Sequence, residues 1–205
     1  MNAATSKALP PSPRPEPAWE IAKLFPAQGS WSVADYLALN GNYLIEFSSG
    51  HIEVLTMPTE LHQLIVAYLY GLLSAFTQKN NLGKALFAPL RIQLTPGKFR
   101  EPDVVFMLAR NTQRRRNDFW EGADLVIEVV SDDDRRRDLE TKRFEYAAAG
   151  IPEYWIVDPQ QSQITVLKLA GDRYDVHGSF TAGQLATSAL LPGFEVNVIA
   201  TFSVK

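Results

Sequence analysis

The chain has 205 residues, of which 46% are hydrophobic and 11% aromatic; this suffices for one globular domain with a sizeable core and excludes a disordered protein. It contains no cysteine, which excludes disulfides, thiolate metal sites and a cysteine nucleophile, and fits a reducing compartment. The net charge of −3 excludes a global basic field, so any binding of nucleic acid must rely on local patches.

The N-terminal segment is rich in Pro, Ala and Ser, which predicts a flexible tail over residues 1–30 ahead of a single domain over 31–205. The tail has no apolar signal core, and no apolar run in the chain reaches the length of a membrane span. We therefore expect a cytoplasmic protein that does not bind a membrane.

The domain is predicted to open with a short helix followed by a hairpin. Ser32, with Asp35 three residues later, is typical of a helix capping box. Two short apolar runs, 43–47 and 51–56, predict an N-terminal β-hairpin. Glu46 lies inside the first strand and is either a functional acid or an outward-facing strand residue.

A long amphipathic helix is predicted next. Thr59 can cap a helix over residues 60–79, in which apolar residues recur at helical spacing. His62 lies in its first turn, where it is either a hydrogen-bonded residue at the edge of the core or a ligand. Two further strands are predicted at 84–89 and 91–95.

The most informative feature is a pair of apolar, β-branched runs over 100–106 and 124–130, each with one carboxylate. A lone carboxylate among Val and Ile is costly unless it is paired or binds a metal. If the strands pair antiparallel, Asp103 at the start of one lies beside Glu128 near the end of the other. Two such oxygen ligands suit Mg²⁺ or Mn²⁺. The alternative is two exposed acids at strand ends.

Two arginine-rich segments flank these strands. By the same antiparallel pairing, the polar loop over 107–122 lies at the far end of the sheet, whereas the charged run over 132–137 lies at the end that carries the acids. The candidates for contact with a polyanion are therefore Arg135, Arg136 and Arg137. A solvated loop is the simpler interpretation of such a run.

A second helix is predicted over about 136–149, and Gly150 is a suitable residue to follow its C-terminus. Asp138, Lys142 and Tyr146 lie at i, i+4 and i+8 and so form one stripe of this helix. An exposed Asp–Lys pair is the plain alternative to a functional group.

The remainder is predicted to be mostly strands. Residues 152–159 form a buried run with a hairpin partner at 163–169, and short strands and turns continue to Lys205. Together the elements indicate an α/β (α+β) protein with a mixed β-sheet core flanked by helices and with extra N- and C-terminal β-hairpins.

Read in order, these motifs resemble the Uma2 family, which belongs to the PD-(D/E)XK nuclease-like superfamily and is common in cyanobacteria. The resemblance covers about residues 31–200 and implies a restriction-endonuclease-like fold. It is carried by EPDVVF at 101–106, DLVIEVVS at 124–131, RDLETKRFEYAAAGIPEYWIVDP at 137–159 and LPGF at 191–194.

The resemblance implies roles for single residues. Asp103 and Glu128 would be catalytic and would bind Mg²⁺ or Mn²⁺ together with the backbone carbonyl of Val129, and Glu46 matches an upstream acid of the metal site. The matching catalytic lysine is Lys142 on the helix. Further matching positions with supporting roles are His62, Asp138 and Tyr146.

The superfamily's usual lysine position falls on Val130 in this chain. Residues 128 and 130 share a face of the strand, and a small Val at 130 leaves room on that face. A helix packed there could deliver the long side chain of Lys142 to Glu128.

The activity implied is that of a Mg²⁺-dependent endodeoxyribonuclease, with DNA as partner and a homodimer wherever two cuts need two sites. One alternative is a catalytically silent nucleic-acid-binding or regulatory protein on a nuclease scaffold, which Val130 keeps open. Another is a partner-binding module that uses the arginine runs. The sequence leaves open which nucleic acid is bound and in what sequence.

Overall fold

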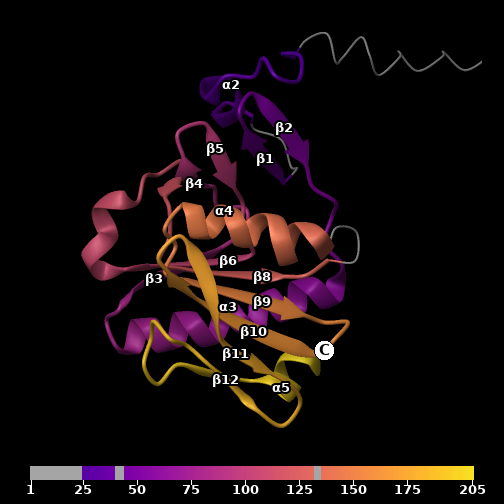
Figure 1. The fold of residues 1–205 in the computed structure, drawn as a ribbon, viewed down its shortest axis with the longest axis vertical. Helices are drawn as coiled ribbons and strands as arrows, with labels where there is room; N and C mark the ends of the chain where they lie inside the picture. The colour runs from indigo at the N-terminus through magenta and orange to yellow at the C-terminus, as the bar shows by residue number, and fades with distance from the viewer. Residues whose placement is uncertain (1–24, 40–43, 132–134) are drawn as a thin grey trace, which may run out of the picture.

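The computed structural model describes residues 25–39, 44–131 and 135–205, and Figure 1 shows their arrangement. The predicted tail over 1–30 lies outside this part of the chain except for its last residues. There the side chain of Gln28 exchanges two hydrogen bonds with the backbone of Ile52, and the N–H of Gly29 donates to the carbonyl of Gly50. Residues 25–30 thus contact the first hairpin.

A six-stranded sheet with strand order β11-β10-β9-β8-β6-β3 forms the centre of the fold. Strands β8 and β9 pair in parallel, whereas the other neighbours in this sheet are antiparallel. Its strands are β3 (Gly83–Phe87), β6 (Val104–Leu108), β8 (Leu125–Val129), β9 (Glu153–Asp158), β10 (Gln163–Ala170) and β11 (Arg173–Phe180).

A second sheet of five strands has the order β2-β1-β5-β4-β7, in which only β4 and β7 pair in parallel. Its strands are β1 (Ile45–Ser48), β2 (His51–Val54), β4 (Ile92–Thr95), β5 (Lys98–Arg100) and β7 (Trp120–Glu121). A two-stranded ribbon, β12 (Leu185–Thr187) with β13 (Glu195–Asn197), lies near the C-terminus.

The helices begin where the capping residues predict. Ser32 and Asp35 form the predicted capping box of α2 (Val33–Leu37), and the hydroxyl of Thr59 accepts from the N–H of His62 at the start of α3 (Glu60–Lys79). The others are the 3₁₀ helix η1 (Ala109–Arg114), the π-helical turn η2 (Arg137–Thr141), α4 (Lys142–Ala148) and α5 (Val198–Phe202). None of the helices in the described ranges is long and apolar enough to cross a membrane.

The central strands β6, β8 and β9 are buried on both faces of the six-stranded sheet, and their successive residues point to opposite sides. Val104 and Ile127 pack with Leu69 of α3 in one cluster, and Val105 and Val126 pack in the other cluster with α4 residues. Figure 1 shows α4 between this sheet and the strands β4 and β5. The fold is thus a mixed α/β structure with few helices and two mixed sheets. The mixed sheet with helices was predicted, whereas the predicted N-terminal hairpin is part of a second sheet.

Three predicted elements differ in detail. The run over 100–106 divides between β5 and β6, which belong to different sheets, because Pro102 offers no N–H to a ladder and the chain bends at Asp103. The predicted loop over 107–122 contains η1 and β7, and α5 forms where only strands and turns were expected.

Candidate active site

The two predicted acids meet at one edge of the six-stranded sheet, where β6 begins and β8 ends. Val104 pairs with Ile127 in the antiparallel register, so Asp103 lies beside Glu128, as the sequence predicts. Glu128 is buried, with a relative exposure of 3%, whereas the side chain of Asp103 keeps 17% of its surface accessible. Solvent therefore reaches this pair from the side of Asp103.

A histidine joins Asp103 to the end of β8. The Oδ2 atom of Asp103 accepts from the N–H of Val129 at 2.7 Å and lies 3.2 Å from Nε2 of His62. The same Nε2 lies 3.1 Å from the carbonyl oxygen of Val129. A carboxylate oxygen and a carbonyl oxygen thus converge on one point, which the Nε2 atom of His62 fills.

The environment of His62 favours its charged form. Burial lowers the pKa of this imidazole, but the hydrogen bond and the charge of Asp103 outweigh burial and raise the pKa above its usual value. The Nδ1 atom is buried and has no hydrogen-bond partner in the described structure. His62 is therefore held on one side only, by the two oxygen atoms of the site.

Lys142 reaches Glu128 from the helix side of the sheet. Its Nζ atom lies 3.0 Å from Oε2 of Glu128 and 2.9 Å from Oδ1 of Asp138. The hydroxyl of Tyr146, one helical turn further, donates to Oε1 of Glu128 at 2.5 Å. Val130 is buried in the same hydrophobic cluster as Tyr146 and Ala147 of α4.

The contacts of the helical turn before Lys142 explain the direction of its side chain. It is the first residue of α4 and follows the π-helical turn η2, and the hydroxyl of Tyr154 on β9 donates to the carbonyl of Asp138 at 2.9 Å. This contact ties η2 to the sheet and places Asp138 and Lys142 together over Glu128. π-Helical turns are rare and occur often at functional sites.

Burial and charge shift the pKa values of the two groups at the centre of this cluster. Burial raises the pKa of Glu128 to about 8, against the opposite effect of Lys142. Burial alone would lower the pKa of Lys142, but the carboxylates of Glu128 and Asp138 outweigh it and raise that pKa above its usual value. The shift of Lys142 keeps its ammonium group charged.

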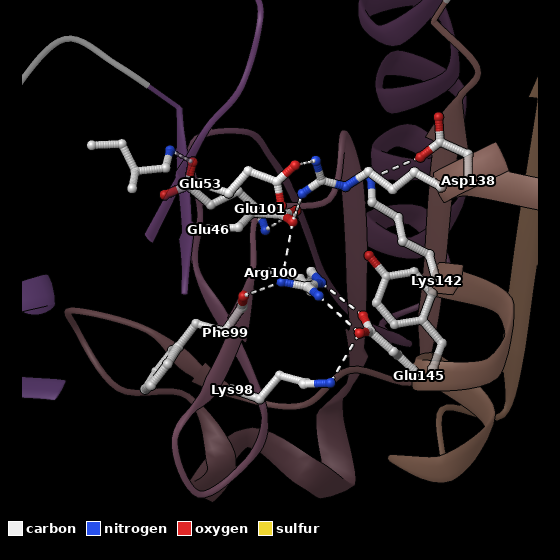
Figure 2. A network of polar contacts seen from close by, with 12 residues as sticks. Glu46, Glu53, Lys98, Phe99, Arg100, Glu101, Asp138, Lys142 and Glu145 are labelled. Carbon is white, nitrogen blue, oxygen red and sulfur yellow. Dashed lines mark hydrogen bonds and ion pairs between the residues drawn. The ribbon is translucent and has the colours of Figure 1, made fainter. Parts of the chain in front are cut away.

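Glu46 is completely buried but is engaged by arginine (Figure 2). Its Oε2 atom lies 3.3 Å from a guanidinium nitrogen of Arg100 and also binds Arg137, and its Oε1 atom accepts from the N–H of Glu101 at 3.3 Å. Two guanidinium groups thus neutralise this carboxylate. Its predicted role as a metal ligand stays a prediction.

The three arginines of the charged run have different surroundings. Arg135 binds both carboxylate oxygens of Asp158, Arg137 binds Glu46 and Glu53, and Arg136 makes an exposed pair with Glu140. Their predicted contact with nucleic acid is untested. Arg135 and Arg137 form ion pairs with carboxylates of this chain.

Asp158 was not predicted as a site residue. It ends β9, next to the end of β8, since Val129 is in register with Val157. Its sequence signal is the one that identified Glu128, an acid at the end of a buried apolar strand, here in Ile156-Val157-Asp158. The side chain is buried, and its hydrogen bonds with Arg135 outweigh burial and lower its pKa.

The donor atoms fit a hard divalent cation. Asp103 Oδ2 and the Val129 carbonyl oxygen already converge on one point, and Glu128 adds a second carboxylate beside them. Within the described residues, no three His, Cys, Asp or Glu side chains lie together as a ready-made metal centre. Mg²⁺ needs few protein ligands, because it keeps several waters and uses substrate oxygens.

Comparison with solved structures supports the fold. The chain is similar to the crystal structure of a "putative nuclease belonging to DUF820" from Anabaena variabilis ATCC 29413, with a TM-score of 0.70 and 16% sequence identity over 84% of this chain and 98% of that chain. No curated protein matches. The family model Uma2, described as "Putative restriction endonuclease", matches residues 33–200. Since this match spans most of the sequence, the chain belongs to the Uma2 family.

Proposed function

We propose that this protein is a metal-dependent endonuclease that hydrolyses phosphodiester bonds in DNA, with Asp103, Glu128 and Lys142 as its catalytic groups. The observation that carries the proposal is the 3.0 Å contact between Lys142 Nζ and Glu128 Oε2. It supports a lysine supplied by the helix in a chain whose strand carries Val130. The family description is consistent with this chemistry.

Each residue of the site has a separate proposed role. Asp103, Glu128 and the carbonyl of Val129 would hold Mg²⁺ or Mn²⁺, which would lower the pKa of a bound water and stabilise charge on the phosphate. Lys142 stays protonated between Glu128 and Asp138 and so supplies a fixed positive charge for the phosphate oxygens. His62 contacts both the carboxylate of Asp103 and the carbonyl of Val129, and its Nε2 atom would have to give way to the metal.

Cleavage of supercoiled plasmid and single-stranded DNA tests this proposal. The wild type is measured in Mg²⁺, Mn²⁺ and EDTA, beside Asp103→Asn, Lys142→Met and the control Lys168→Met, which removes an exposed lysine. We expect metal-dependent cleavage that Lys168→Met retains and that both site variants lose by a factor of about 100 or more. Full cleavage by Asp103→Asn would refute the assignment. Double-strand breaks would imply two sites, as in a homodimer, which sedimentation would detect.

A second function is favoured by one observation. Both carboxylate oxygens of Glu128 already accept, from Lys142 and from Tyr146. A site closed in this way suits a nucleic-acid-binding protein on a nuclease scaffold. That function predicts DNA binding that is equally tight in EDTA and in Asp103→Asn, without cleavage of either substrate.

A further inference from the structure

The side chains of Arg135, Arg136 and Arg137 point alternately into the protein and out to solvent. Arg135 binds Asp158 through two nitrogen–oxygen contacts of 3.0 and 2.5 Å, and Arg137 binds Glu53 at 2.5 Å as well as Glu46. The arginine between them points outward, with 84% of its side chain exposed. Two of the three guanidinium groups are thus directed into the protein from one short segment.

The acids that receive these groups come from different sheets. Asp158 ends β9 in the six-stranded sheet, whereas Glu46 and Glu53 face each other as a registered pair on β1 and β2 of the five-stranded sheet. Figure 2 shows Glu46 and Glu53 on one side of the network of polar contacts and Asp138 and Lys142 on the other. The start of the helix is therefore fixed to both sheets.

The chain continues directly from these contacts into the site. Asp138 follows Arg137, and Lys142 lies one turn further with its ammonium group between Asp138 and Glu128. Twelve residues from Arg137 to Ala148 are too few for a stable helix in isolation, so the orientation of this segment depends on its tertiary contacts. Glu46 is fully buried, and a buried ion pair constrains geometry strongly because neither charge can be left without its partner.

We infer that Glu46 and Asp158, through Arg137 and Arg135, are positioning residues that set where Lys142 meets Glu128. This inference rests on the proposed catalytic role of Lys142. The ion pairs Arg135–Asp158 and Arg137–Glu46 thus form an internal clamp, which fixes the position of the segment that carries Lys142. Only the outward arginine is directed at solvent within the described part of this arginine run.

The test compares three carboxylate-to-amide variants. Glu46→Gln and Asp158→Asn each weaken one side of the clamp, and Glu140→Gln is the matched control, since Glu140 pairs with the outward Arg136 at the surface. The first readout is the NMR signal of the Lys142 ammonium in protein labelled with ¹⁵N-lysine, assigned by its loss in Lys142→Met. The second is the division of any cleavage defect between kcat and KM.

We expect Glu46→Gln and Asp158→Asn to shift or broaden the Lys142 signal and to lower kcat by a factor of about 10 to 100, with KM nearly unchanged, because a small displacement of a catalytic group costs rate. Glu140→Gln should change neither. An unaltered Lys142 signal in both folded variants, or the same change in Glu140→Gln, would overturn the inference.

A second variant and a readout that is independent of cleavage keep the inference falsifiable. Should Glu46→Gln fail to fold, Arg135→Lys keeps the charge but loses the two-pronged contact with Asp158 and must still shift the signal. The NMR readout needs no cleavage, so a wild type that cuts no DNA would refute the proposed function and leave the clamp to be judged by the Lys142 signal.

Discussion

Replacing Lys142 by Met should destabilise the fold strongly. Lys142 is buried, with a relative exposure of 5%, and its Nζ atom lies 3.0 Å from Glu128 and 2.9 Å from Asp138. Methionine has a similar length but leaves two buried carboxyl groups without their cation. Breaking a buried pair in this way costs about 3–5 kcal/mol in the free energy of unfolding. For a chain of this size that loss lowers Tm by roughly 6–20 °C.

The sign of the pH dependence follows from Glu128. Its pKa is raised to about 8 in the folded protein, so the folded state binds a proton that the unfolded state has released, and stability falls as the pH rises from the unfolded pKa to about 8. Lys142 lowers that pKa, so Lys142→Met raises it further. The variant should therefore continue to lose stability above pH 8, where the wild type has stopped.

Urea unfolding at pH 7 and pH 9.5 measures both effects, with the exposed Lys168→Met as control. The deficit of Lys142→Met should be larger at pH 9.5 than at pH 7. Adding Asp138→Asn should restore part of the loss, because an amide replaces a carboxylate that lacks its partner. A deficit below about 1 kcal/mol at pH 7, or one independent of pH, would refute this account of the cluster.

Three further predictions concern buried polar groups, and urea unfolding measures each of them. Burial raises the pKa of Glu101 to about 7 from 4.5, so between pH 5 and 7.5 the wild type should lose about 2–3 kcal/mol relative to Glu101→Gln; equal slopes would contradict this. Glu153 accepts from Trp155 Nε1, Ser188 Oγ and two backbone N–H groups at 2.6–2.7 Å. Glu153→Gln turns one acceptor into a donor facing donors and should cost about 2–4 kcal/mol, while an unchanged midpoint would show that the loop over 188–190 repacks without cost. Tyr146→Phe removes the 2.5 Å donor to Glu128 and should cost about 1–3 kcal/mol, unless a water replaces the hydroxyl.

Features set by nearby residues could be predicted from the sequence. Thr59 and the helical spacing that follows it define α3 to the residue, and two β-branched runs joined by a polar segment predict the antiparallel pair that brings Asp103 beside Glu128. In these cases periodicity or alternation determines which face a residue occupies. The contact of Lys142 with Glu128, by contrast, was expected only from the resemblance to the Uma2 family, and the small Val130 left room for it.

Features set by distant partners could not be predicted. Glu46 binds Arg137, which lies 91 residues away, and no local pattern indicates that an acid inside a strand will be neutralised by arginine. The division of the run over 100–106 depends on β1 pairing with β5, a contact between segments some 50 residues apart. The buried proline at 102 marks the break, but only the second sheet explains it.

The parallel pairing of β8 with β9 has a consequence for relatives of this protein. Parallel neighbours need a connection that crosses back over the sheet, and here that connection is the segment with η2 and α4, which carries Lys142. An insertion or deletion within the helical stretch between Arg137 and Lys142 would rotate the lysine away from Glu128 even if the strands still paired. The length of this segment should therefore be fixed among active relatives, whereas the tight turns between β9, β10 and β11 are free to vary.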